Sequence, residues 1–179
     1  YGLSMTAVMA AVTCVLAPMS IPIGPVPISF TNLAIYLSLY LLGWKRGTVS
    51  YLVYVLIGMV GVPVFSGYGA GIAKLAGPTG GYLVGYLLLA FIGGLFIEKS
   101  KGQPVISGIG LVLGDAACYV LGTIWFMILT GADLVSALGW CVLPYLPGDA
   151  VKIVLAAVLT MQLDKRLKGS LCLLYTSPS

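Results

Sequence analysis

Three long stretches of the chain contain no Asp, Glu, Lys or Arg, and they restrict its fold more than any other feature. They are residues 1–44, 47–73 and 75–97. Each exceeds the roughly 20 residues that an α-helix needs to cross the ~30 Å hydrocarbon core of a bilayer. Over the whole chain 60% of the residues are hydrophobic and only 8% are charged. The sequence therefore predicts an integral membrane protein.

The apolar stretches lack the two-residue alternation of a membrane β-barrel, so the membrane spans are expected to be α-helices. The segment 18–27 contains four prolines and is expected to be a stiff loop, because proline cannot continue a helix. The glycine-rich segment 61–78 is too irregular for a spanning helix. Proline, glycine and charge together predict six spans, near residues 3–19, 30–43, 47–61, 79–98, 105–129 and 148–165.

The basic residues indicate how this bundle is oriented. Seven of the nine fall in connections on one side of the predicted bundle: Lys45, Arg46, Lys99, Lys101, Lys165, Arg166 and Lys168. The positive-inside rule makes this side cytoplasmic. The connections 18–27, 61–78 and 130–147 would then face outward and converge on a pocket that opens to the outside.

The predicted fold is therefore an all-α integral membrane protein with six transmembrane helices and both termini in the cytoplasm. Residues 1–168 are expected to form a single domain. The composition changes after this point, so residues 169–179 are expected to be a non-native or disordered tail.

An acid and a base lie three residues apart in Pro147-Gly148-Asp149-Ala150-Val151-Lys152, at the start of the last apolar span. Residues three apart share a helix face, and ionisable groups at membrane depth usually indicate a functional site. The alternative is that Asp149 only caps the helix by accepting from its first N–H groups. Capping does not explain Lys152, because a cation in the first turn opposes the helix dipole.

Two further features have two interpretations each. Asp115 lies near the middle of the span 105–129, either as a protonated or hydrogen-bonded carboxyl or as a group that couples transport to protons. Ala7 and Ala11, like Thr6 and Ala10, form small-xxx-small pairs that allow another helix to approach closely. Such pairs serve either internal packing or contact with a partner subunit.

The sequence argues against several functions. It contains no histidine, and Cys14, Cys118, Cys141 and Cys172 lack metal-site spacing, so no zinc or haem site is expected. The segment 69–75 lacks the residues of a phosphate-binding loop, and no Ser or Cys has a candidate base beside it. We therefore expect no enzyme activity, no ATP hydrolysis, no cofactor, no metal and no nucleic-acid partner.

Four segments of the chain carry a further signal. They are Pro25-Val26-Pro27-Ile28-Ser29-Phe30-Thr31-Asn32, Gly61-Val62-Pro63-Val64-Phe65-Ser66-Gly67-Tyr68-Gly69, Gly77-Pro78-Thr79-Gly80-Gly81-Tyr82-Leu83-Val84-Gly85-Tyr86 and Pro147-Gly148-Asp149-Ala150-Val151-Lys152. These segments resemble the BioY family, whose members are biotin-binding S components of energy-coupling-factor (ECF) transporters. The resemblance extends from the first span to about Lys168.

The resemblance implies a six-helix biotin-capture subunit in a bacterial cell membrane, surrounded by lipid. It also implies a transmembrane coupling subunit and two cytoplasmic ATPases as partners, with Ala7 and Ala11 facing the coupling subunit. The different class of function that remains open is a self-sufficient, proton-coupled secondary transporter of a small carboxylated vitamin, in which Asp115 or Asp149 titrates.

Biotin has a ureido ring at one end and a carboxylate at the other. Asp149 is expected to accept from a ureido N–H and Lys152 to donate to the ureido oxygen; the opposite assignment, with Lys152 on the carboxylate, stays open. Tyr82 and Tyr86 are expected to stack on the ring body, or else to belong to the aromatic belt of the membrane interface. The remaining candidates, for the carboxylate, are Thr31, Asn32, Tyr68 and Lys74.

Overall fold

The computed structural model of the chain describes residues 2–23, 26–100 and 103–175, and for residues 104, 160 and 163–175 it describes the backbone alone. The described part is mainly helical, as the sequence predicts. In chain order its elements are α1 (Gly2–Leu16), β1 (Ser20–Ile21), β2 (Ile28–Ser29), α2 (Thr31–Met59), the 3₁₀ helix η1 (Ser66–Tyr68), α3 (Ile72–Ala76), α4 (Gly80–Lys99), α5 (Pro104–Thr130), α6 (Leu134–Cys141) and α7 (Leu146–Tyr175).

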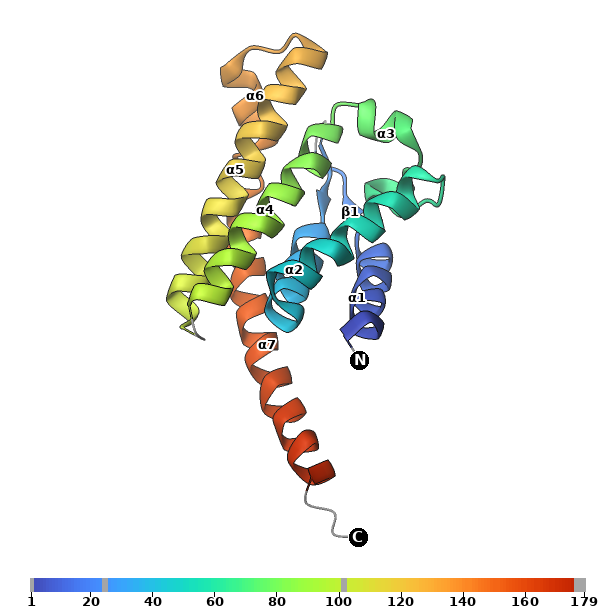
Figure 1. Cartoon of the computed structure of the whole chain (residues 1–179). Helices are drawn as coiled ribbons and strands as arrows, with labels where there is room; N and C mark the ends of the chain where they lie inside the picture. Colours follow the sequence, from blue (N-terminus) through green and yellow to red (C-terminus); the bar gives the residue numbers. More distant parts are fainter. Residues whose placement is uncertain (1, 24–25, 101–102, 176–179) are drawn as a thin grey trace.

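Helix α2 is a helical hairpin rather than one straight rod. Gly43 has a φ of +77° and a ψ of 176°, a conformation that glycine adopts easily because it lacks a Cβ. A Cβ added at Gly47 would lie 3.3 Å from the Cα of Leu39, whereas eight residues of a straight helix span about 12 Å. The two halves of α2 therefore correspond to the predicted spans 30–43 and 47–61, and Figure 1 shows the chain turning back between them.

Helices α4 and α5 run side by side (Figure 1) and approach each other closely at glycines. A Cβ added at Gly85 of α4 would lie 3.0 Å from the Cα of Cys118, and one added at Gly114 of α5 would lie 3.1 Å from the Cα of Leu89. Small residues allow membrane helices to approach this closely, and packing contacts then replace the hydrophobic effect as the main attraction.

The last helix completes the arrangement that positions the site. Helix α7 packs mainly against α2 and to a smaller extent against α5. Its start at Leu146 precedes the predicted start at residue 148, because Pro147 is tolerated in the first turn of a helix, where its missing N–H has no intrahelical partner. The predicted connection 130–147 contains one more helix, α6, which is too short to cross a bilayer and buries only Ala137 and Cys141.

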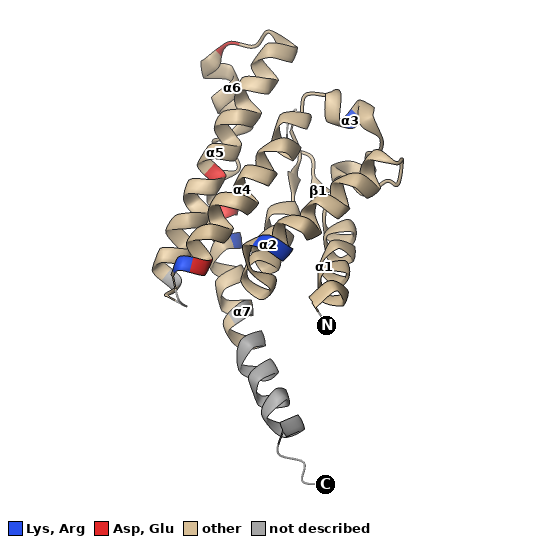
Figure 2. Ribbon diagram, in the orientation of Figure 1, with Lys and Arg blue, Asp and Glu red and all other residues tan. Residues whose placement is uncertain are grey.

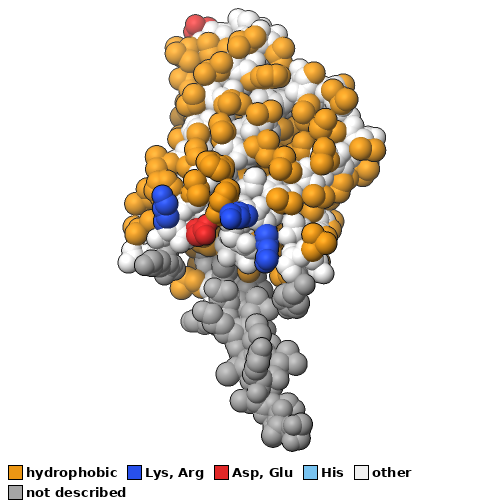
Figure 3. All heavy atoms as spheres, in the orientation of Figure 1, with side chains coloured by type: hydrophobic (Ala, Val, Ile, Leu, Met, Phe, Trp, Pro, Cys, Tyr) orange, Lys and Arg blue, Asp and Glu red, His pale blue; other side chains and the backbone are white. Residues whose placement is uncertain are grey.

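Three apolar segments are long enough to cross a membrane: Gly80–Lys99, Val105–Thr130 and Leu134–Leu159; α1 is apolar but shorter. Hydrophobic side chains cover most of the face in Figure 3, and the basic side chains visible there gather in one band. Figure 2 shows how few positions along the described ribbon are charged. This surface fits a protein whose solvent is largely lipid.

The orientation of the bundle stays a prediction. Trp44, beside Lys45 and Arg46, packs against Gly94 of α4, so these basic residues and Lys99 at the end of α4 lie at the same end of the bundle. The other residues on which the positive-inside argument depends lie outside the part whose side chains are described: Lys101, Lys165, Arg166 and Lys168. The proposed tail 169–179 is likewise a prediction; the backbone of α7 is described as far as Tyr175.

The glycine contacts give a prediction for stability. Gly110→Ala should lower the free energy of unfolding by about 1–3 kcal/mol, because the added methyl group would collide with Cβ and Cγ of Phe96 on α4. Gly108→Ala, two residues earlier in the same helix, is the matched control, since no heavy atom of the described residues lies within 4 Å of its added Cβ. Denaturant unfolding in detergent measures both variants, and equal stability of the two would contradict the close packing of α4 and α5.

Candidate functional site

The acid and the base predicted from the sequence form a buried ion pair near the start of α7. Nζ of Lys152 lies 3.0 Å from Oδ1 of Asp149, and the two residues are only 7% and 6% exposed. The ammonium also donates to the backbone oxygen of Ser29 at 2.8 Å and to Oδ1 of Asn32 at 3.0 Å. A lysine ammonium has three N–H donors, so protein acceptors use all of them.

The carboxylate of Asp149 accepts hydrogen bonds from side chains on three helices. Oδ1 accepts from Lys152 and, at 2.6 Å, from Nδ2 of Asn32 on α2, and Oδ2 accepts from the hydroxyl of Tyr119 on α5. The capping interpretation does not describe this residue, because α7 begins before it and its own N–H already donates to the backbone oxygen of Tyr145 at 2.8 Å. Asp149 therefore joins α2, α5 and α7 at one buried point.

A second carboxyl lies beside this cluster. Asp115 on α5 is 6% exposed and accepts a hydrogen bond from the hydroxyl of Tyr36 on α2. Asp115 and Tyr119 are four residues apart, as are Asn32 and Tyr36, so each pair shares one helix face. These faces of α2 and α5 meet at the carboxyl groups of Asp115 and Asp149. Among the described residues, only Asp149 forms an ion pair with a lysine.

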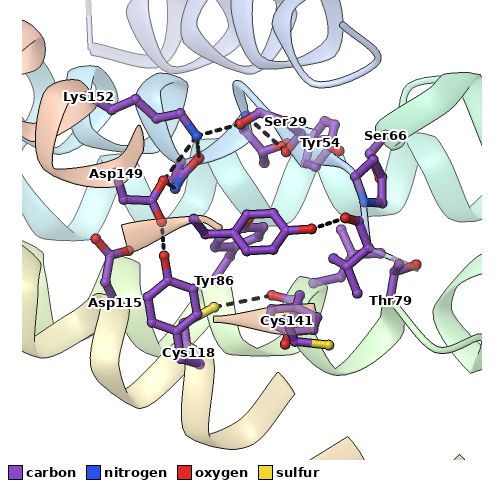
Figure 4. A pocket seen from close by; sticks show the side chains of 18 residues that line it. Ser29, Tyr54, Ser66, Thr79, Tyr86, Asp115, Cys118, Cys141, Asp149 and Lys152 are labelled. Carbon is purple, nitrogen blue, oxygen red and sulfur yellow. Dashed lines mark hydrogen bonds and ion pairs between the residues drawn. The ribbon is translucent and has the colours of Figure 1, made fainter. Parts of the chain in front are cut away.

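These groups form one end of a cavity of about 40 Å³. Figure 4 shows Lys152, Asp149 and Asp115 on one side and Ser66, Thr79 and Cys141 on the other, with Tyr86 between them. The lining residues are Val26, Pro27, Ser29, Thr31, Asn32, Tyr54, Ser66, Thr79, Tyr82, Leu83, Tyr86, Asp115, Cys118, Tyr119, Cys141, Tyr145, Asp149 and Lys152. The cavity thus has a charged end, an aromatic middle and an end with hydroxyl groups and a thiol.

The connections that the sequence predicts to lie at the outer face meet beside this cavity. The strands β1 and β2 pair antiparallel across the proline-rich segment, with Ser20 opposite Ser29 and Ile21 opposite Ile28. The hydroxyl of Tyr145, between α6 and α7, donates to the backbone oxygen of Val26 in this segment. The two connections that the sequence places at the outer face therefore contact each other beside the site.

Six of the eight predicted ligand-binding residues line the cavity: Thr31, Asn32, Tyr82, Tyr86, Asp149 and Lys152. Thr31 is buried, and its hydroxyl shares a 2.8 Å hydrogen bond with that of Ser29. The other two predicted residues are not among those that line it: Tyr68 in η1 is 70% exposed, and Lys74 in α3 packs against Gly69.

The predicted partner contact lies on α1. Ala7 and Ala11 are exposed there, whereas Thr6 and Ala10 are buried. The buried pair packs inward, so the exposed pair is available to another helix.

Sequence reasoning missed Tyr36 and Tyr119 as members of the site. The available signal was their spacing, because each lies one helical turn from a polar residue that the sequence analysis had singled out. Ser29 acts through its backbone oxygen, for which a sequence gives no signal. Among the described residues, no group of three His, Cys, Asp or Glu side chains could hold a metal ion.

Almost the whole of this fold is matched by known proteins. The family model described as "BioY family" matches residues 2–169. The biotin transporter BioY of Thermotoga maritima is 37% identical over 88% of this chain and 92% of its own length. The probable biotin transporter BioY of Pyrococcus horikoshii is 35% identical over 90% of this chain and 94% of its own.

A solved structure agrees in fold as well. The S component for biotin from an ECF-type ABC transporter superposes with a TM-score of 0.84 at 32% identity, over 92% of this chain and 90% of that chain. A second S component of a bacterial ECF transporter is 20% identical, has a TM-score of 0.50 and supports the fold alone. The chain therefore belongs to the BioY family.

Proposed function

We propose that the chain captures biotin at the outer side of the cell membrane as the S component of an ECF-type importer. The names of its relatives and of the similar solved structure support this role. The observation that carries the proposal is the cavity at Asp149, where a polar cluster from three helices is buried beneath the outer connections. Buried ionisable groups at membrane depth are costly and usually functional.

The proposed membrane arrangement follows from the fold. The six spans are α1, the two halves of α2, α4, α5 and α7, with both termini in the cytoplasm. The sequence lacks a phosphate-binding loop, and we propose that partners supply the energy for import. These are a transmembrane coupling subunit and two cytoplasmic ATPases, and the exposed Ala7 and Ala11 are the proposed contact with the coupling subunit.

The hydrogen bonds around the ion pair favour one orientation of the ligand. A carboxylate has about four acceptor positions, and three on Asp149 are filled by Lys152, Asn32 and Tyr119. The remaining position on Oδ2 can accept a ureido N–H of biotin. Lys152 has no donor left for the ureido oxygen, so it acts as a positioning residue that orients the side chain of Asp149.

Ligand entry requires the cavity to widen. A volume of about 40 Å³ has room for only a few water molecules, and biotin is much larger. The outer connections meet through the hydrogen bond from Tyr145 to Val26, so their separation is the simplest way to admit the ligand from outside.

The site assignment predicts how substitutions at Asp149 affect affinity. Asp149→Ala should weaken biotin binding by 30-fold to several thousand-fold, or about 2–5 kcal/mol. The loss arises because a ureido N–H, Lys152, Asn32 and Tyr119 would all lose their acceptor. Asp149→Asn should be milder, because its amide oxygen still accepts hydrogen bonds.

Titration calorimetry on the purified, detergent-solubilised variants measures these affinities, and thermal unfolding without ligand reports on the fold. Asp133→Ala is the control, because it removes an exposed carboxylate at the start of α6. Affinities within about twofold of the parent for both Asp149→Ala and Lys152→Ala, against the ~2–5 kcal/mol expected, would reject the assignment.

The proposed partner contact predicts a separation of binding from transport. Replacing Ala7 and Ala11 by Leu should leave biotin affinity unchanged, because both residues are exposed on α1 and do not line the cavity. Uptake by the assembled transporter should fall about tenfold or more, which corresponds to ~1.4 kcal/mol of lost helix contact.

The control for this double variant is Val120→Phe, which enlarges an exposed apolar side chain on α5 and should not affect uptake. Uptake is measured in cells that contain all the transporter subunits, and affinity on the purified chain. Loss of biotin binding together with uptake would show that Ala7 and Ala11 serve internal packing instead.

A further inference from the structure

A second hollow, on the outside of the bundle, is a groove along α5. Its volume is about 490 Å³, and its other side is formed by α6 and the start of α7. None of its lining residues is Asp, Glu, Lys or Arg, and those on α5 have the three- and four-residue spacing of one helix face. The residues are Ala116, Tyr119, Val120, Thr123, Ile124, Met127, Leu134, Leu138, Val142 and Leu146.

The groove and the cavity share a wall. In the chain from α6 to α7, Cys141 and Tyr145 line the cavity, whereas Val142 and Leu146 line the groove. Tyr119 lines both, and its hydroxyl donates to the carboxylate of Asp149 in the site. Whatever fills the groove therefore packs against the back of the cavity wall.

The described part of the chain does not fill the groove itself. Val120, Ile124 and Leu134 are each more than half exposed. Helix α6, beside the groove, buries only Ala137 and Cys141. An apolar hollow offers water few hydrogen-bond partners, and an unfilled gap loses the dispersion contacts of the atoms around it. Apolar atoms from outside the chain are therefore expected in the groove.

The length of the groove indicates which molecule supplies those atoms. From Ala116 to Met127 the axis of α5 rises by about 16 Å, and one leaflet contributes about 15 Å, half of the ~30 Å hydrocarbon core. In the proposed orientation α5 ends at Thr130 on the outer side, so the groove matches the depth of the outer leaflet. Through Val120 and Ile124 it is continuous with the apolar surface that α5 shares with α4. A lipid acyl chain has the matching length, carries no charge and can enter sideways.

We propose that one acyl chain of an outer-leaflet phospholipid occupies this groove and supports the cavity wall from behind. The inference rests on the membrane orientation given under the proposed function and adds a lipid site to it. The acyl chain packs on Tyr119 and behind Tyr145, whose hydroxyls donate to Asp149 and to the backbone oxygen of Val26. Lipid and ligand therefore bind cooperatively, and each raises the affinity of the other by the same factor.

Native mass spectrometry of the purified full chain tests the lipid site. The probe is dioleoyl-phosphatidylethanolamine, because residues 102–151 contain no Lys or Arg to pair with an anionic head group. The parent should retain one such lipid. Leu138→Trp, which fills the groove with an indole ring, should reduce this retention by about 5- to 100-fold, as expected for overpacking.

Val135→Trp is the matched control for Leu138→Trp. It adds the same indole ring to the same helix, but Val135 is exposed and does not line the groove, so lipid retention should stay at the parent value. Thermal unfolding checks that each variant is folded. Ile124→Trp, on the opposite side of the groove, provides an independent result if Leu138→Trp is unstable.

Titration calorimetry with and without the lipid tests the role of the groove. Removing lipid by exhaustive detergent exchange should weaken biotin binding to the parent by about 5- to 100-fold, the usual size of such coupling. The probe lipid should restore the affinity, whereas dihexanoyl-phosphatidylethanolamine should not, because its chains are too short to reach Tyr119. Leu138→Trp should bind biotin equally well with and without lipid, because its ring replaces the acyl chain.

Three results would overturn the inference. The first is equal lipid retention by the parent and by both groove variants, and the second is a biotin affinity that does not change when lipid is removed. The third is a dimer of the parent that Leu138→Trp dissociates without changing lipid retention, which would assign the groove to a second copy of the chain. A parent that binds no biotin in any lipid would reject the proposed function instead, and lipid retention alone would then decide whether the groove is a lipid site.

Discussion

The rest of the site depends on the three hydrogen bonds that the ammonium of Lys152 donates within the protein. A lysine inside a membrane bundle is tolerated only when its charge is compensated and its donors are used. Lys152 meets both conditions through Asp149, Asn32 and the backbone oxygen of Ser29. These partners come from α7, from α2 and from the strand before α2. Removing any one of them would leave a buried polar group unpaired, so the cluster holds α7 against α2 as well as shaping one end of the cavity.

Helices α4 and α5, which pack closely together, form further walls of the cavity. Glycines bring these helices together at Gly85 and Gly114, directly beside the turn of α5 that carries Asp115 and Tyr119. The same pairing sets the start of α4 against α5, where Tyr82 packs on Gly122. One helix pair therefore positions both ends of the cavity: α5 contributes the partners of the charged end, and α4 contributes the hydroxyls of the opposite end.

The sequence predicts the helical membrane class and the ion pair because both leave strong local signals. Charge-free stretches fix the class, and three-residue spacing places Asp149 and Lys152 on one face. The sequence did not predict that α7 begins at Leu146 or that α6 precedes it, since both depend on tertiary packing rather than on composition. It also names Tyr68 and Lys74 as candidates for the ligand's carboxylate, and only the fold shows that neither lines the closed cavity. The roles of Tyr36 and Tyr119 depend on contacts between helices far apart in sequence, and their four-residue spacing from Asn32 and Asp115 is only an indirect signal of those contacts.

We propose that the chain recognises biotin by itself and relies on partners only for energy. Equilibrium binding of biotin to the purified chain, without any coupling subunit or ATPase, tests this claim most directly. The predicted result is saturable binding that other B vitamins do not reduce at large excess, because they lack the ureido ring whose N–H donates to Asp149. Binding that appears only after the partner subunits are added, or equal competition by unrelated vitamins, would contradict the account.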